Sequence, residues 1–319
     1  MRKLLVVALL AFSSLSFAQP YPSKPIKMVI GFPPGGPSDI FGRAFAQALG
    51  AQLGQPVIVE NKSGVGGVLG TDAAAKAPPD GYTLAFNNQG SVAMAPFSMA
   101  HLPYDANKDL ALITTVVKVP EIIVAHPALG VSTLAELIAK AKSMPGNINY
   151  GSAGAGGITH LAGELLKAEA QIDIVHVPYK GAAPAVSDLL GGQVQFGIFD
   201  VPVVLPHIKS GKLKALAATT GKRVPTLPDV PTTAEAGYPK VTSDNWYGLC
   251  APAATPPDIV KRLNAAAVAA LHTPALAEQF AKVGGIPFPS TPEEYRAFLA
   301  EEQARWGRII RAIGFKEQD

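Results

Sequence analysis

The stretch VIGFPPGGPSDIFGRAFAQAL, residues 29–49, sets two prolines and two glycines between an apolar, strand-like run and a helical pattern. Pro33 and Pro34 stiffen the turn, because the proline ring fixes φ. Gly35 and Gly36 permit positive φ and let a ligand come close to the backbone. The stretch therefore predicts a rigid turn that presents backbone N–H groups.

The turn leads into a helix that either Ser38 or Asp39 can cap. Helix N-termini carry about half a positive charge, and their unpaired N–H groups favour anions. The segment from Phe32 to Asp39 contains no lysine or arginine. The anion that suits it is therefore a carboxylate rather than a triphosphate, and we predict that this segment forms one half of an anion site.

A second stretch, INYGSAGAGGITHLAGELL at residues 148–166, repeats the design with four glycines in its loop and again no basic residue there. The alternative is that glycine and proline only make tight turns in both places. Two matched loops in separate lobes favour the ligand interpretation. The residues predicted to line this second half are Ser152, Ala153, Gly154, Gly156 and Thr159.

The chain of 319 residues is long enough for two domains. Apolar residues make up 48% and charged residues 16%, which excludes disorder, and no window reaches the roughly 18 unbroken apolar residues of a membrane span. We expect a globular protein with two lobes.

The N-terminus has the layout of a cleavable secretory signal, with a buried strand as the alternative. Arg2 and Lys3 precede an apolar run from Leu4 to Phe12, and small residues end at Ala18. We therefore predict that residues 1–18 are removed and that the exported protein is periplasmic.

Charge and cysteine content exclude several classes. Without Arg2 and Lys3 the chain has 25 basic and 24 acidic residues, a formal net charge of +1, which argues against nucleic-acid binding. Cys250 is the only cysteine, so there is no disulfide framework or thiolate metal cluster. No dinucleotide or Walker motif and no HExxH pattern occurs. We expect no cofactor and no metal.

Strand-like runs alternate with helical patterns, which indicates α/β lobes with parallel sheets. The long apolar segment 109–126 is interrupted by Pro120 and suggests a crossing between lobes, and the proline-rich segment 221–240 suggests a second one. The layout predicts a hinged fold that closes on a ligand. The expected first lobe comprises residues 19–120 and 225–319, and the expected second lobe comprises 121–224.

Two helices have boundary signals of their own. Thr133 and Glu136 form a capping-box pattern, as do Thr291 and Glu294. Gly314 is expected to end the second of these helices.

Ligands of open parallel sheets bind outside the carboxyl ends of the strands. The strand ends outside the two loops give four further candidates. Asn88 and Ser91 suit hydrogen bonding to a polar ligand end, although such residues are common in turns. Lys180 could reach a second carboxylate, although most exposed lysines are only solvated. Asp200 could accept from a ligand amine or hydroxyl, or simply cap the next helix.

Two further interpretations stay open. Trp246 and Tyr247 could form a wall of the cleft or belong to the core. Ser152 lacks the GxSxG elbow of a hydrolase nucleophile, but triads assemble in space, so an enzyme with Ser152 as its nucleophile is an alternative.

The chain resembles the periplasmic receptors of tripartite tricarboxylate transporters, the Bug family. The matching segments run through the chain in order from residue 21: YPSKPIKMVIGFPPGGPSD, LGQPVIVENKSGVGG, APPDGYTL, LPYDANKDL, HVPYKGAAPAVSDLLGGQVQFGIFD, HIKSGKLKALAATT, LPDVPTTAEAGYP, WYGLCAPAATP and TPEEYRAFLAEE. Gly31 stands where relatives often have proline, and VENKSGVGG replaces a typical VENRPGAGG. Neither departure touches the predicted anion site.

The resemblance implies a two-lobed Venus-flytrap fold of type II, no catalysis, and delivery of an organic anion to an integral-membrane permease. It also implies that one ligand carboxylate is held between the two loops, at Phe32 to Asp39 and Gly151 to Thr159, partly through ordered water. The ligand is then a small mono-, di- or aromatic carboxylate, and we expect a monomer. An amino-acid receptor in which Asp200 faces an ammonium, and a sensor that docks on a membrane kinase, are the alternatives.

Overall fold

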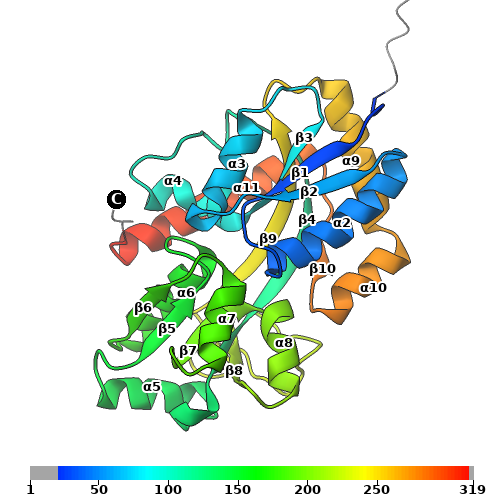
Figure 1. Cartoon of the computed structure of the whole chain (residues 1–319). Coiled ribbons are helices and arrows are strands. Elements are labelled where there is room, and N and C mark those ends of the chain that lie inside the picture. The colour runs from blue at the N-terminus through cyan, green and yellow to red at the C-terminus, as the bar shows by residue number, and fades with distance from the viewer. Residues whose placement is uncertain (1–20, 316–319) are drawn as a thin grey trace, which may run out of the picture.

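The computed structural model describes residues 21–315. Two α/β lobes lie one above the other in Figure 1, joined by long strands near the centre. The predicted signal segment 1–18 lies outside the described residues. Within residues 21–315, no helix combines the length and the apolar character that crossing a membrane requires.

The first lobe contains the strand order β2-β1-β3-β9-β4, with β10 also paired to β4. Helices cover both faces of this sheet (Figure 1). The strands are β1 (Ile26–Ile30), β2 (Val57–Asn61), β3 (Thr83–Asn88), β4 (Leu110–Ala125), β9 (Asp244–Pro252) and β10 (Ile286–Pro287). The helices are α2 (Pro37–Leu53), α3 (Val68–Ala75), α4 (Ala95–Ser98), α9 (Pro257–Leu271), α10 (Pro274–Lys282) and α11 (Pro292–Ala312).

The second lobe is built on the other end of β4, which pairs with β8 on one side and with β7, β5 and β6 in that order on the other. Its other strands are β5 (Asn149–Ser152), β6 (Val175–Pro178), β7 (Phe196–Asp200) and β8 (Lys214–Ala218). Its helices are α5 (Leu134–Ser143), α6 (Ile158–Ala170), α7 (Ala182–Leu190) and α8 (Val201–Lys209).

Both sheets are mixed rather than purely parallel, which corrects one expectation from the sequence. The pairs β1–β2, β1–β3, β5–β6 and β5–β7 are parallel. However, β9 runs antiparallel to β3 and β4, and β4 runs antiparallel to β7 and β8. The reason is connectivity, because β4 carries the chain out of the first lobe and β9 carries it back in the opposite direction.

The first crossing lies inside one continuous strand. Between Leu110 and Pro120, β4 pairs with β9, and from Glu121 to Ala125 it pairs with β7 and β8. The strand therefore changes partners at Pro120 without breaking, and the two sheets share it.

The return crossing involves the end of a long loop. Val224 and Leu227 pack in one apolar core of the second lobe, and Val241 packs in another. The Ser243 N–H then donates to the Thr219 carbonyl at 2.9 Å, just before β9 begins. We therefore propose that the return lies near Ser243 and that the second lobe extends past residue 224 to this point.

The predicted capping box is complete at α11, whereas at α5 only its Thr133 half forms. The Thr291 side chain and the Glu294 carboxylate form a complete capping box at the start of α11, and Gly314 follows its end with φ of 67°. At α5, Thr133 accepts from the Glu136 N–H, while the Glu136 carboxylate accepts from the Ser132 N–H.

An apolar cluster joins the lobes outside the sheets. Residues of α6 in the second lobe pack against α11 and the helical turn Gly90–Met94 in the first. Phe315, which follows α11, sets its ring edge against the His160 ring at 4.8 Å between centroids. The lobes are therefore in contact, and the arrangement is closed. The buried members of this interlobe cluster are Met94, Ile158, Leu161, Trp306 and Ile310.

Replacing Phe315 with alanine should shift the ligand-free protein toward an open arrangement. Phe315 is partly buried against the interlobe cluster, so its contact with His160 contributes only part of the roughly 1.5–3 kcal/mol of a fully buried phenylalanine side chain. This contact joins the two lobes, so its removal should weaken their association. Small-angle X-ray scattering should give a larger radius of gyration than for the parent chain. Ile286→Ala, at an exposed side chain on β10, is the matched control. A radius equal to that of the parent for both variants would contradict the prediction.

Candidate functional site

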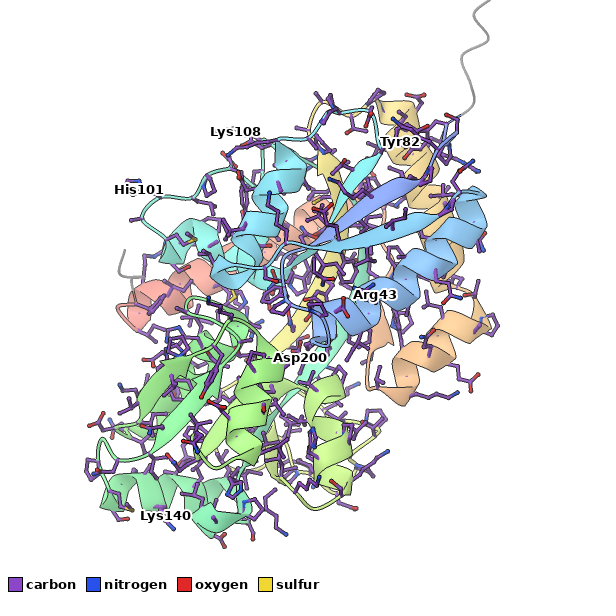
Figure 2. All side chains as sticks on the ribbon, in the orientation of Figure 1. Arg43, Tyr82, His101, Lys108, Lys140 and Asp200 are labelled. Carbon is purple, nitrogen blue, oxygen red and sulfur yellow. The ribbon has the colours of Figure 1, made fainter. Side chains whose placement is uncertain are left out.

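A cavity lies between the lobes and encloses about 540 Å³ of space outside the atoms, part of it open to solvent. Asp200, at the end of β7, marks its position at the junction of the lobes in Figure 2. The cavity is lined by Phe32, Pro33, Gly36, Pro37, Ser38, Gly66, Asn88, Ala153, Gly157, Ile158, Thr159, Gly181, Ala182, Ala183, Asp200, Asn245 and Tyr247.

Three helix N-termini meet at this cavity. Each helix contributes the same three positions, the N-cap residue and the first two helical residues, where backbone N–H groups have no partner within the helix. Pro37 is the exception, because proline has no N–H, so α2 offers the N–H groups of Gly36 and Ser38 only. One helix comes from the first lobe and two from the second, so their positive ends face each other across the cleft. The residues are Gly36, Pro37 and Ser38 of α2, Gly157, Ile158 and Thr159 of α6, and Gly181, Ala182 and Ala183 of α7.

The loops before α2 and α6 have nearly the same backbone geometry. The N-cap Gly36 has φ of −81° and ψ of 173°, and the N-cap Gly157 has φ of −81° and ψ of 172°. A glycine with positive φ precedes each of them, Gly35 at 83° and Gly156 at 68°. Side chains other than glycine rarely adopt such φ values, which explains Gly35 and Gly156. Gly36 and Gly157 have extended backbone angles that any residue can adopt.

The same internal hydrogen bond holds both loops. The Gly35 N–H donates to the Asp39 carboxylate at 3.1 Å, and the Gly156 N–H donates to Nδ1 of His160 at 3.0 Å. In each case the acceptor is the third residue of the helix. The two loops are thus one local structure built twice, with different acceptor side chains.

Asp39 belongs to this support rather than to the cavity lining. Its carboxylate also accepts from Arg43 Nε at 2.8 Å and from Asn61 Nδ2 at 3.0 Å. Burial by itself would raise the pKa of Asp39, but the hydrogen bonds from Arg43, Asn61 and Gly35 outweigh it and hold the pKa below its usual range. Asp39 is therefore charged and its acceptor positions are in use.

Ser152 lies beneath the second loop. Its hydroxyl is 2.6 Å from Nε2 of His176, and the His176 ring stacks on the His160 ring at 3.6 Å between centroids. Desolvation lowers the pKa of His176 to about 4 and contributes most to lowering that of His160 to about 3. A serine hydrogen-bonded to a neutral histidine has the composition of a nucleophile–base dyad, but Ser152 is fully buried and is not part of the cavity lining.

A polar wall made of Asp200, Asn245 and Tyr247 also lines the cavity. The Tyr247 hydroxyl donates to Asp200 Oδ2 at 2.8 Å, and Asn245 Nδ2 donates to the same oxygen at 2.9 Å. Tyr247 is part of the first-lobe strand β9, so this contact crosses between the lobes. Asp200 is the only formally charged residue among those that line the cavity.

Seven of the residues predicted from the sequence line the cavity, and eight lie outside its lining. Pro34 and Gly35 are exposed on the outer side of the first loop, Ser91 is buried with its hydroxyl bonded to Thr71 and Asn88, and Lys180 lines a second pocket at the mouth of the cleft. The seven are Phe32, Gly36, Ser38, Asn88, Ala153, Thr159 and Asp200, and the other eight also include Asp39, Ser152, Gly154 and Gly156.

Sequence reasoning missed Gly66, Ala182, Ala183 and Asn245. Gly66 lies in the loop after β2, where residues 64–67 all have positive φ, and three of these four are glycine. A glycine cluster at the end of a strand is a sequence signal that could have identified Gly66 as a cavity residue. The sequence left open whether Trp246 and Tyr247 form a cleft wall or belong to the core. Tyr247 lines the cavity, whereas Trp246 is a core residue whose Nε1 donates to Glu302 at 3.1 Å.

Other chemistries find little support in the described part of the chain. Residues 21–315 contain no group of three or more His, Cys, Asp or Glu side chains that could hold a metal ion. Cys250 is fully buried in β9, and burial raises the pKa of its thiol to about 12. It is a structural thiol.

The fold and the cavity together define a two-lobed solute-binding protein. Protein BugT of Bordetella pertussis is 40% identical to the chain over 322 aligned positions, which cover 99% of each. A solved R. palustris protein with adipate is 32% identical with a TM-score of 0.90, over 93% of this chain and 99% of that one. MatC from Rhodopseudomonas palustris with bound malate is 31% identical with a TM-score of 0.86, over 91% and 100%.

The family model described as "Tripartite tricarboxylate transporter family receptor" matches residues 41–315. The chain belongs to this receptor family. The resemblance drawn from its sequence motifs and the expected periplasmic-binding-protein fold are both confirmed.

Replacing Gly181 with alanine should weaken ligand binding by hindering closure. A Cβ on Gly181, in the second lobe, would lie 2.9 Å from Cδ of Pro33 in the first lobe, and the φ of 151° disfavours any side chain. We expect at least a tenfold rise in Kd by calorimetric titration and a larger radius of gyration with ligand bound. Gly221→Ala, where the added Cβ meets nothing, should behave like the parent. Parent-like binding by Gly181→Ala would show that the two loops do not need this close contact.

Proposed function

We propose that the protein is a periplasmic receptor that captures a small organic carboxylate between its lobes and delivers it to the integral-membrane permease of a tripartite tricarboxylate-type transporter. The observation that carries the proposal is that N-termini of helices from both lobes line one cavity whose lining includes no lysine or arginine. Membership of the receptor family, and solved relatives that hold adipate and malate, support the same ligand class.

The helix ends suit a carboxylate for electrostatic reasons. Each helix N-terminus carries about half a positive charge and offers backbone N–H donors. The hydroxyl of Thr159 accepts from the Ala153 N–H at 2.8 Å, so its own proton is free for a ligand oxygen. A ligand bound to α2 on one side and to α6 and α7 on the other holds the lobes together, because each lobe alone provides only part of the donors.

An amino-acid receptor is the second candidate, and Asp200 is the observation that favours it. Its carboxylate lines the same cavity as the helix ends, where it could accept from a ligand ammonium. A carboxylate at one end and an ammonium at the other would then match the charges of the site.

A thermal-shift screen of mono-, di- and aromatic carboxylates tests the proposed ligand class. At a hundred times its Kd, a ligand adds about 2.7 kcal/mol to the free energy of unfolding, so at least one acid should raise Tm clearly. Because the contacts are short and enclosed, the affinity of that acid should change little between low and physiological salt. A panel without any stabilising carboxylate, or a steep salt dependence, would contradict the proposal.

Matched four-carbon ligands separate the two candidates. Succinate, malate and aspartate differ only in carrying hydrogen, hydroxyl or ammonium on the second carbon. For a carboxylate receptor, Asp200→Asn should preserve or strengthen succinate and malate binding, because it removes a negative charge beside an anion. A tenfold or greater loss confined to aspartate would favour the amino-acid receptor. Calorimetric titration of the parent and the variant measures both outcomes.

A further inference from the structure

A second buried carboxyl group lies beside Asp200. Glu121, on β4, is the direct cross-strand partner of Asp200 on β7. Directly opposed residues in antiparallel strands project to the same face, with Cβ atoms about 4.5–5.5 Å apart. Glu121 is fully buried, and its carboxyl oxygens have no partner in good hydrogen-bond geometry among the described residues. The Ser243 hydroxyl, itself without another partner, is the one donor close enough to oppose the rise of the Glu121 pKa.

The charged groups that act on Glu121 are acidic. Asp200 faces it from β7, and Asp244 faces it from the start of β9, where it lies opposite Pro120. Lys118 and Arg305 act on Asp244 instead. Glu121 thus has like-charged neighbours and no cation to balance an ionised carboxylate.

The two carboxyl groups of the pair differ in the support that they receive. Asp200 accepts from the Tyr247 hydroxyl and the Asn245 amide. Burial raises its pKa to about 7, although these two donors oppose the rise. Burial raises the pKa of Glu121 well above its usual range, and the charge of Asp200 raises it further. An isolated ionised carboxylate in such a place neutralises by taking up a proton.

We propose that Glu121 is a positioning residue that keeps its proton at neutral pH, so that the Glu121–Asp200 pair holds one negative charge at most, located on Asp200. Glu121 then acts on the ligand through Asp200 rather than by contact. This consequence rests on the proposed function. With both groups ionised, two negative charges would lie behind a cavity that has to admit an anion, whereas a neutral Glu121 leaves only the charge that Tyr247 and Asn245 stabilise.

Infrared spectroscopy of the ligand-free full chain tests the proposal directly. With isotope-labelled glutamate carboxyl groups, the parent at neutral pH should show the carbonyl stretch of a protonated glutamic acid. The band should be absent in Glu121→Gln and present in the control Glu60→Gln, which removes an exposed carboxylate paired with Lys27. A parent spectrum without the protonated band overturns the proposal, and so does a band that survives in Glu121→Gln.

The pH dependence of stability gives a second readout. A glutamate with a raised folded pKa keeps a proton that the unfolded chain releases above about pH 4.3. Stability is therefore lost as pH rises from there to the folded pKa, by a tenfold change in the unfolding constant per pH unit for one proton. Glu121→Gln should remove the share of this slope that Glu121 contributes, leaving the share of Asp200, whose pKa is also raised. The variant should therefore be more stable than the parent at alkaline pH. A profile parallel to that of the parent overturns the proposal.

These measurements do not depend on identifying the ligand. If Glu121→Gln fails to fold, the infrared band of the parent still decides whether a buried glutamic acid is protonated, and Asp200→Asn should shift the stability profile by removing the like charge. A carboxylate screen without a stabilising ligand would contradict the proposed function but would not affect the proposal for Glu121 and Asp200. A parent spectrum without the protonated band would contradict the proposal for this pair but not the proposed function.

Discussion

Backbone N–H groups at helix starts, which have no acceptor within their own helix, are the constraint on which this structure depends. Three helices direct such groups into one cavity from two lobes, and their positive ends repel one another when the cleft is closed. Negative charge is needed to balance them, and the cavity lining offers only Asp200 for this purpose. The arrangement of the sheets, in which β4 and β9 cross between the lobes, brings these helix ends opposite each other.

The construction of the loops shows how a chain can present N–H groups without losing its shape. At Gly35 and Gly156, a positive φ turns the backbone so that its N–H bonds back to the third helical residue. That bond fixes the loop and leaves the N–H groups at the helix start unused. Asp39 and His160 occupy the same position with different chemistry, so the geometry requires an acceptor there but no particular residue.

Short-range sequence patterns predict much of the fold and of the candidate site. The glycine and proline turns, the lobes and the capping box at Thr291 follow from short-range patterns. The support role of Asp39 is only partly visible in the sequence: Arg43 lies one helical turn away, but its other partner, Asn61, lies 22 residues away and no local pattern connects them. Ala182 and Ala183 contribute backbone groups, which leave no side-chain signal. The pairing of Glu121 with Asp200 depends on strand register across some 80 residues, which a single sequence does not specify.

The interlobe cluster around Trp306 and Leu161 has a consequence for how such receptors diversify. This apolar contact lies apart from the polar wall at Asp200, and it adds the same favourable energy to closure for every ligand. For any solute that binds the helix ends, part of the free energy of lobe closure therefore comes from this apolar contact and not from the solute. Substitutions in the polar wall can exchange one cargo for another without a matching change in the hinge, so ligand choice and the mechanics of closure can evolve separately.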